Sequence, residues 1–321
     1  MIERHPELAD PFLVLERMET FGDYARAYGD RLAEHYEALG AIVIPHLPID
    51  FDLAFLQQLA FPREWKKIGT LNGIEQPVIV RKGGQIAPDP SHPLITILKE
   101  IPLAVYVQSQ VARFNSQLRI ALRTLFPRYY SLEKTVNITW RLTETRDEGM
   151  HLDVFDSGRP MNARLRAQHR VKIFVNIDSE PRRWRVSYDL PRLLKRCRDQ
   201  LPDALPDDVN VLNNVLDKVG VLDDLPAHQV AYPTLSAVIV NAEAVAHEVV
   251  FGRRMVAGEF ICDSADMLDP ARHTHACLGR WLTEAGFQIA SDPAEVARQY
   301  AGLIGSYEFK QASMSTTGPA D

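Results

Sequence analysis

Two potential metal ligands lie two residues apart in the segment GMHLDVFD, residues 149–156. Side chains alternate between the two faces of a β-strand, so His151 and Asp153 point the same way if this segment is extended. A third candidate ligand, His247, follows later in the segment NAEAVAHEVVFG. Two histidines and one carboxylate on one face of an octahedron leave three positions open, as in non-haem Fe(II) oxygenases that use a 2-oxo acid and dioxygen. The spacing therefore predicts an iron site that takes 2-oxoglutarate and O2.

The alternative for His151 is an ordinary strand histidine, because a His-x-Asp pair arises by chance in many chains of this length. A second pair, His273 and His275, falls in the predicted helix HTHACLGRWLTEAGF. In a helix this spacing places the two rings on different faces. We therefore interpret His273 and His275 as solvated surface residues.

The distal carboxylate of 2-oxoglutarate needs a cation, and arginine suits it because the guanidinium can pair with it bidentately. Arg254 follows the distal histidine in HEVVFGRR. Arg141 and Lys172 project from the predicted strands VNITWRLT and VKIFVNI, on the faces opposite the apolar residues. We add Asn176, on the Lys172 face, and Trp184, whose alternative is an ordinary core tryptophan, as candidates for binding the cosubstrate.

Basic residues gather between positions 159 and 185, where Arg159, Arg164, Arg166, Arg170, Lys172, Arg182, Arg183 and Arg185 face only Asp178 and Glu180. Such a local excess of positive charge in an acidic protein indicates an anionic substrate. The alternative is a solvated basic loop.

The bulk composition predicts a soluble globular protein. The 321 residues are 46% hydrophobic and carry a net charge of −6, which argues against a general nucleic-acid binder. Three cysteines without close spacing indicate neither a disulfide framework nor a Cys-x-x-Cys site, as expected in a reducing cytoplasm. A charged N-terminus and the lack of a long apolar stretch argue against export and membrane insertion. Hydrolase and kinase motifs are absent.

The elements that must position these residues change character along the chain. Helical patterns dominate the first part, and near residue 135 the hydrophobic period changes to two, before helical patterns return at the end. This order predicts an α+β fold with a β-rich core, an antiparallel sheet or jelly roll flanked by helices. The expected single domain covers residues 1–310, with a helical part to about 130, a core at about 131–262, a partly helical insertion at 187–230, terminal helices at 270–306 and a flexible tail at 311–321.

Three segments together resemble the Kdo hydroxylase family: HLDVFDSGRP, VKIFVNIDSEPRRWRV and AVAHEVVFG. The resemblance extends from about residue 40 to about residue 262. Members of that family are Fe(II)/2-oxoglutarate dioxygenases that hydroxylate C3 of Kdo, 3-deoxy-D-manno-oct-2-ulosonic acid, the acidic sugar of the lipopolysaccharide inner core. The resemblance implies a cupin-like double-stranded β-helix and the metal ligands His151, Asp153 and His247.

The resemblance also implies that arginines on strands flanking the His-x-Asp motif hold the cosubstrate. One of them matches Arg141, whereas the other position is Lys172, which lacks the planar two-donor fork. Arg254 is then the residue to compensate.

The leading hypothesis is a cytoplasmic oxygenase that hydroxylates Kdo in a lipid A precursor, with peripheral contact to the inner membrane. One alternative keeps the oxygenase and changes the substrate to an amino acid, a peptide or a natural-product intermediate. Another is a non-catalytic or zinc-binding jelly-roll protein. The insertion at 187–230 would act as a lid or as a contact in a homo-oligomer.

Overall fold

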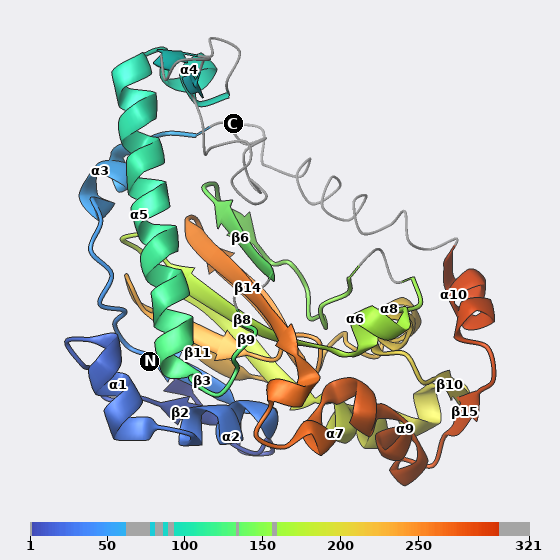
Figure 1. Ribbon diagram of the computed structural model, residues 1–321. Coiled ribbons are helices and arrows are strands. Elements are labelled where there is room, and N and C mark those ends of the chain that lie inside the picture. The colour runs from blue at the N-terminus through green and yellow to red at the C-terminus, as the bar shows by residue number, and fades with distance from the viewer. Residues whose placement is uncertain are drawn as a thin grey trace.

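The computed structural model describes residues 2–61, 78–80, 86–88, 93–132, 135–155 and 159–301 (Figure 1). The fold is α+β, with two large and mostly antiparallel sheets and helices packed against them. The expected tail at 311–321 and the last residues of the expected terminal helices, 302–306, lie outside the described residues.

One sheet has five strands, all paired antiparallel. Its order is β1 (Ile2–Glu3), β11 (His228–Tyr232), β9 (Arg182–Asp189), β13 (Val245–Gly252) and β7 (Thr145–Arg146). The other sheet has six strands, antiparallel except for the pair β2 and β3. Its order is β2 (Phe12–Val14), β3 (Ala41–Ile44), β12 (Ala237–Val240), β8 (Gln168–Asn176), β14 (Met255–Asp263) and β6 (Thr135–Arg141).

The two sheets meet through aromatic side chains. Phe174 of β8 and Trp184 of β9 make an edge-to-face contact with ring centroids 4.8 Å apart. The period-two pattern of β6 and β8 explains this arrangement, because Ile138, Trp140 and Ile173 point away from the gap and are buried on the other face of the six-stranded sheet. The polar face of each of these strands is thereby turned toward the five-stranded sheet.

Helix α5 (Ile101–Leu125) covers the outer face of the six-stranded sheet (Figure 1). Its helical spacing buries Phe114 and Leu118, and Phe114 packs edge-to-face on Trp140 with centroids 5.2 Å apart. Pro102 lies in the first turn, where a missing backbone N–H costs nothing. The buried face of α5 therefore packs against the sheet that carries Arg141 and Lys172.

Helix α8 (Val209–Val219) lies within the expected insertion and holds the chain next to Asp153. Asp208 caps its first turn by accepting hydrogen bonds from two backbone N–H groups, and Gly220 ends it in the left-handed conformation. Its Asn213 donates through Nδ2 to the carbonyl of Asp153 at 3.0 Å and to that of Glu243 at 2.8 Å. The helix therefore helps to fix the segment that carries the His-x-Asp pair.

The remaining elements are short. The small sheets pair β4 (Val78–Val80) with β5 (Ile86–Pro88) and β10 (Ala204–Pro206) with β15 (Gln288–Ala290). The other helices are α1 (Phe21–Tyr28), α2 (Arg31–Glu37), α3 (Leu53–Gln58), α4 (Pro93–Leu98), α6 (Ala163–Arg166), α7 (Leu190–Arg196), α9 (Thr274–Glu284) and α10 (Pro293–Ala301). Within the part of the chain that the structure describes, no helix is long and apolar enough to cross a membrane.

The N-terminal part differs from the expected helical region up to about residue 130. Its strands β1, β2 and β3 join the edges of both large sheets, so sheet residues begin well before residue 131. The segment before Gly40 forms two helices, α1 and α2, because the chain turns at Gly29, where φ is 51°.

Candidate metal centre and adjoining pocket

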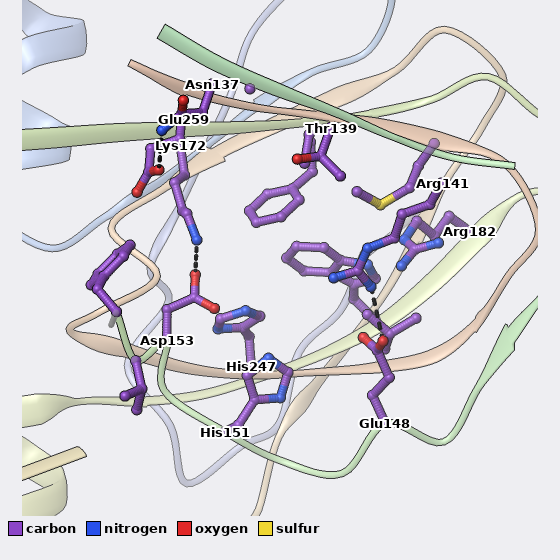
Figure 2. Close-up of a pocket in the computed structure, with 18 residues that line it drawn as sticks. Asn137, Thr139, Arg141, Glu148, His151, Asp153, Lys172, Arg182, His247 and Glu259 are labelled. Atoms are coloured by element: carbon purple, nitrogen blue, oxygen red, sulfur yellow. Dashed lines mark hydrogen bonds and ion pairs between the residues drawn. The ribbon is translucent and has the colours of Figure 1, made fainter. Parts of the chain in front are cut away.

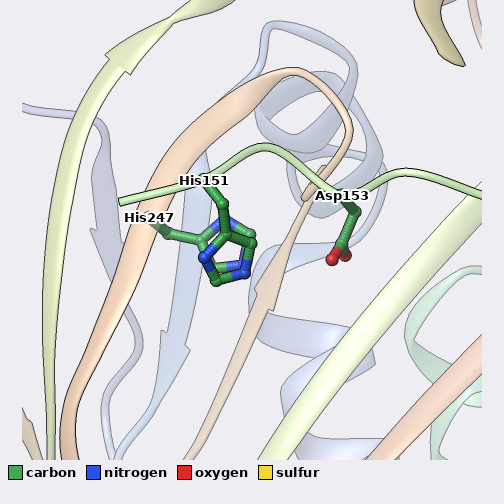
Figure 3. A group of neighbouring side chains, drawn as sticks. All are labelled: His151, Asp153 and His247. Atoms are coloured by element: carbon green, nitrogen blue, oxygen red, sulfur yellow. The ribbon is translucent and has the colours of Figure 1, made fainter. Parts of the chain in front are cut away.

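The structure brings His151, Asp153 and His247 together between the two sheets (Figure 3). One ligand atom from each side chain lies within 4.8 Å of the others, and the carboxylate and both rings are turned toward the same space. The two histidines sit opposite each other in an antiparallel bridge, with backbone N–H to carbonyl distances of 2.9 and 3.0 Å. Residues far apart in the sequence are thus positioned by main-chain pairing.

Each imidazole has one nitrogen tied to the backbone. Nδ1 of His151 lies 2.8 Å from the carbonyl oxygen of Gly149, and Nδ1 of His247 lies 3.0 Å from that of Val245. A carbonyl accepts only, so Nδ1 donates in both rings, and a neutral ring then keeps the lone pair on Nε2. This arrangement is typical of metal-binding histidines.

The environment of His247 keeps its ring neutral. The side chain is 3% exposed and stacks on Trp184 with centroids 5.3 Å apart. Burial, assisted by the neighbouring His151, lowers the pKa of His247 to about 4. A neutral imidazole at pH 7 is the form that coordinates a metal.

Asp153 is paired with a cation on the facing sheet. Its Oδ2 contacts Nζ of Lys172, and its carbonyl accepts the Asn213 hydrogen bond described above. Burial alone would raise the pKa of Asp153, but Lys172 and the two histidines outweigh this effect and hold the pKa below its usual range. The residues present therefore fit a divalent metal, because two imidazoles whose Nε2 atoms are not bonded to the backbone lie beside one ionised carboxylate.

The three candidate ligands line one pocket, with a cavity volume of about 250 Å³ (Figure 2). Figure 2 shows Asn137, Glu259 and Lys172 on one side of the ligands and Arg141 and Arg182 on the other. Apolar side chains also line the pocket, and they include Val249, Met255, Phe174 and Trp184. The pocket therefore has two chemically different ends.

The arginine end carries an excess of positive charge. Arg141 donates to Glu148 at 2.8 Å, while Arg182 is 2% exposed, and its Nε and Nη2 have no hydrogen-bond partner within the described ranges. Burial, with Arg141 next in effect, lowers the pKa of Arg182 to about 9, and the carboxylate of Glu148 offsets this shift only in part. A Cβ at Gly252 would lie 2.2 Å from Nη1 of Arg182, so a glycine at this position makes room for the side chain.

The predicted cosubstrate residues separate in the structure. Arg141, Lys172 and Trp184 line the pocket, whereas Arg254 and Asn176 are not among its lining residues. Arg254 donates to the carbonyl of Leu59 at 2.7 Å, and Asn176 donates to the carbonyls of Glu180 and Tyr232, both at 2.9 Å. The side chains of Arg254 and Asn176 therefore bond to backbone carbonyls and do not join the other predicted cosubstrate residues in the pocket lining.

Arg182 was missed as a site residue, although the sequence contains a signal for it. In the strand segment RRWRV, Arg182 and Trp184 are two residues apart and so share a face. Because Trp184 was a candidate for binding the cosubstrate, Arg182, which shares its face, was a better candidate than Arg183 or Arg185. The rest of the basic cluster is dispersed, since Arg164 and Arg166 lie in α6 and the residues from Arg170 onward lie in β8 and β9.

The interpretation of His273 and His275 as surface residues was wrong. His273 is 3% exposed and precedes α9, and its Nε2 lies 3.0 Å from the carbonyl oxygen of Gln168. Both ring nitrogens of His275 are shielded from solvent, without a hydrogen-bond partner among the described residues. The helix begins one residue later than the pattern suggested, so the argument from opposite helix faces does not apply.

Comparison with known proteins found similarity in structure. No family model and no curated protein sequence matches the chain. The apo structure of the Kdo hydroxylase KdoO, a non-heme Fe(II) alpha-ketoglutarate dependent dioxygenase, is 16% identical, with a TM-score of 0.61 over 85% of this chain and 96% of that one. Its complex with succinate and Fe(III) is 17% identical, with a TM-score of 0.61 over 88% and 98% of the two chains. Its complex with alpha-ketoglutarate and Fe(III) is 16% identical, with the same TM-score and coverage. The chain therefore has the fold of the Kdo hydroxylase structures, as its sequence segments predicted.

Proposed function

We propose that the protein is an Fe(II)- and 2-oxoglutarate-dependent dioxygenase. The observation that carries this proposal is the convergence of His151, Asp153 and His247 within 4.8 Å, beside a buried cationic end of the same pocket. The fold shared with Kdo hydroxylase supports it. We further propose that the two sheets form a double-stranded β-helix and that residues 1–310 are one domain.

The protein contributes ligands, orientation and exclusion of water. His151 and His247 bind the metal through Nε2, and Asp153 binds it through a carboxylate oxygen, which leaves positions for 2-oxoglutarate and O2. Iron with bound 2-oxoglutarate activates O2 and supplies the oxidising power to hydroxylate an unactivated C–H bond of the substrate. The apolar surfaces of Phe174 and Trp184 keep the space beside the metal dry.

The cosubstrate lies toward the arginine end in this proposal. Arg182 offers a buried guanidinium with unpartnered N–H groups, and Arg141 adds a second cation against the one carboxylate of Glu148. The distal carboxylate of 2-oxoglutarate would balance the remaining positive charge of the two arginines. It would also accept hydrogen bonds from the N–H groups of Arg182 that have no other partner. Lys172 is engaged with Asp153 and is therefore assigned to the metal ligand rather than to the distal carboxylate.

For the substrate we propose hydroxylation of an anionic sugar, at C3 of Kdo in a lipid A precursor. The fold shared with Kdo hydroxylase over most of the chain, together with the segments of similar sequence, supports this choice. With that substrate the protein would work at the cytoplasmic face of the inner membrane.

The test is an anaerobic titration of the apo-protein with Fe(II) and 2-oxoglutarate, followed through the visible charge-transfer band of an iron-bound keto acid. The band is expected in the wild type and lost in Asp153→Ala. Its absence in folded wild-type protein that retains zinc would contradict the oxygenase and favour a metal-binding module. If the band forms, O2-dependent release of succinate on addition of Kdo-containing lipid A precursors tests the substrate.

A further inference from the structure

The end of the pocket opposite the arginines is lined by residues that lie side by side on neighbouring strands of the six-stranded sheet, and we call these residues a row. Asn137 of β6 pairs with Glu259 of β14, and Glu259 pairs with Lys172 of β8. Arg141 lies four residues further along β6, which is about 13 Å at the usual rise of a strand. Figure 2 shows the candidate metal ligands between these two ends. If the proposed function holds and the cosubstrate occupies the arginine end, the substrate approaches from the row of Glu259.

The cations in and beside this row, Lys172 and Arg170, are already matched by carboxylates. Nη1 of Arg170 lies 3.1 Å from Oε2 of Glu243, and both side chains are buried. Lys172 contacts Asp153 and stands next to Glu259 in the row. Within the portion of the chain that the structure describes, this end of the pocket therefore offers no surplus cation to a carboxylate or a phosphate.

Glu259 instead presents an acceptor that lacks a donor. Its Oε2 accepts from Nδ2 of Asn137 at 3.2 Å, which orients the carboxylate. Its Oε1 is shielded from solvent and has no hydrogen-bond partner among the described residues, since the nearest cation, Nε of Arg170, is 3.7 Å away. A buried acceptor of this kind costs stability unless a donor reaches it.

We propose that Glu259, oriented by Asn137, selects the substrate by accepting a hydrogen bond from a hydroxyl or ammonium group next to the C–H bond that reacts. The same end rejects carboxylate and phosphate groups, because they would meet the Glu259 charge without a free cation. An acidic sugar would then present hydroxyl groups to Glu259 and keep its own carboxylate away from this row. The proposal rests on the proposed function and adds how that site chooses its substrate.

The test uses the full-length protein loaded with Co(II) and saturated with 2-oxoglutarate, and it follows the visible spectrum of cobalt as probes are added. The methyl ketoside of Kdo supplies hydroxyl donors, hexylamine supplies an ammonium, and hexanoate supplies an anion without a donor. One of the two donor probes should bind the wild type, and which one does so identifies the donor. Glu259→Met should weaken that binding about ten- to a hundred-fold, with Glu259→Gln in between, because a hydrogen bond to a charged acceptor is lost. The affinity for 2-oxoglutarate should stay unchanged in both variants.

The matched control is Glu180→Met, since Glu180 is ion-paired with Arg253 at 3.0 Å but does not line the pocket. It should bind every probe like the wild type. Equal binding of the donor probe by Glu259→Met and wild type would overturn the proposal, as would tighter binding of hexanoate or no binding of either donor probe. A loss of 2-oxoglutarate affinity in Glu259→Met would place Glu259 at the cosubstrate and also overturn it. If wild-type protein forms no spectrum of cobalt with 2-oxoglutarate, the proposed function itself fails.

A role for Glu259 in folding alone makes a different prediction. If its function were to pair with Arg170, Glu259→Met would unfold at a lower temperature than Glu180→Met and bind the donor probe normally. Our proposal expects no such loss of stability, because the replacement removes a buried carboxylate oxygen that lacks a donor.

Discussion

Among the described residues, two groups of buried or half-buried histidines differ in how their ring nitrogens are used. His151 and His247 each have Nδ1 against a backbone carbonyl, and their rings converge with the carboxylate of Asp153. His169 is buried as well, yet neither of its ring nitrogens has a partner within the described ranges. Its ring packs edge-to-face on Tyr36 and Tyr129, with centroids 5.6 and 5.4 Å apart, and on His273 at 5.8 Å.

The difference teaches that burial and close spacing do not make a metal site. Of the residues that the structure describes, His151, Asp153 and His247 form the one group of at least three candidate ligands whose atoms converge. The group of His169, His273 and His275 instead fills space among aromatic rings, and burial lowers the pKa of His169 to about 3. In the second group only His273 has a ring nitrogen against a backbone carbonyl, whereas both histidines of the first group do, and their rings also converge with a carboxylate.

The strongest way to break this comparison is to remove one histidine from each group. His247→Ala should weaken Co(II) binding more than about 100-fold, because a direct ligand matters more than the outer partners whose loss costs up to about that much. His273→Ala should leave the affinity unchanged. Isothermal titration of the apo-proteins with Co(II) measures both, and similar losses in the two variants would contradict the assignment.

Arg182 and Arg254 offer a similar comparison, because Arg182 lines the pocket and Arg254 does not. Arg182→Met should raise the Kd of 2-oxoglutarate about ten- to a hundred-fold with metal affinity retained, because charged hydrogen bonds to the distal carboxylate are lost. Arg254→Met is the matched control, since this guanidinium contacts the Leu59 carbonyl outside the pocket lining. Titration of the charge-transfer band gives both constants. A larger effect in Arg254→Met would indicate that Arg254 binds the cosubstrate, as the sequence predicted.

Asn213 sharpens the comparison, because its side chain bridges the carbonyl of Asp153 in the first group and that of Glu243 near the second. Asn213→Ala should weaken Co(II) binding about tenfold, the lower end of the effect of outer partners. Asn214→Ala is the control, as Nδ2 of Asn214 has no partner among the residues described. Equal metal affinity of the two variants would show that α8 does not position Asp153.

The smallest effect at neutral pH is expected from replacing His169, in the second group of histidines. His169 has its pKa lowered by burial from 6.5 to about 3, so the unfolded chain binds more protons below pH 6.5 and the folded state loses stability as the pH falls toward 3. His169→Phe should reduce the slope of unfolding free energy against pH between 6 and 4 by up to about 1.4 kcal/mol per pH unit. Urea denaturation of the metal-free proteins measures the slope. An unchanged slope would mean that His169 is protonated in the folded state.

Much of the pocket could be read from local patterns. The alternation in VNITWRLT and VKIFVNI predicted which faces carry Arg141 and Lys172, and both residues line the pocket. The candidate ligands His151, Asp153 and His247 were chosen by type and spacing, and the structure brings them together. Residue types and a period of two are local properties, which is why the sequence was sufficient for these inferences.

Other features depended on contacts between distant segments. Whether Arg254 or Arg182 reaches the pocket depends on where β13 ends and on which face of β9 meets the other sheet. The burial of His273 depends on packing against β8, and strands β1 and β3 pair with β11 and β12, which lie about two hundred residues away in the sequence. The sequence by itself determined the choice of candidate ligands and the faces of the central strands. Only the tertiary structure decided which cations lost their partners, because pairing and burial of charge are set by strand register and long-range packing.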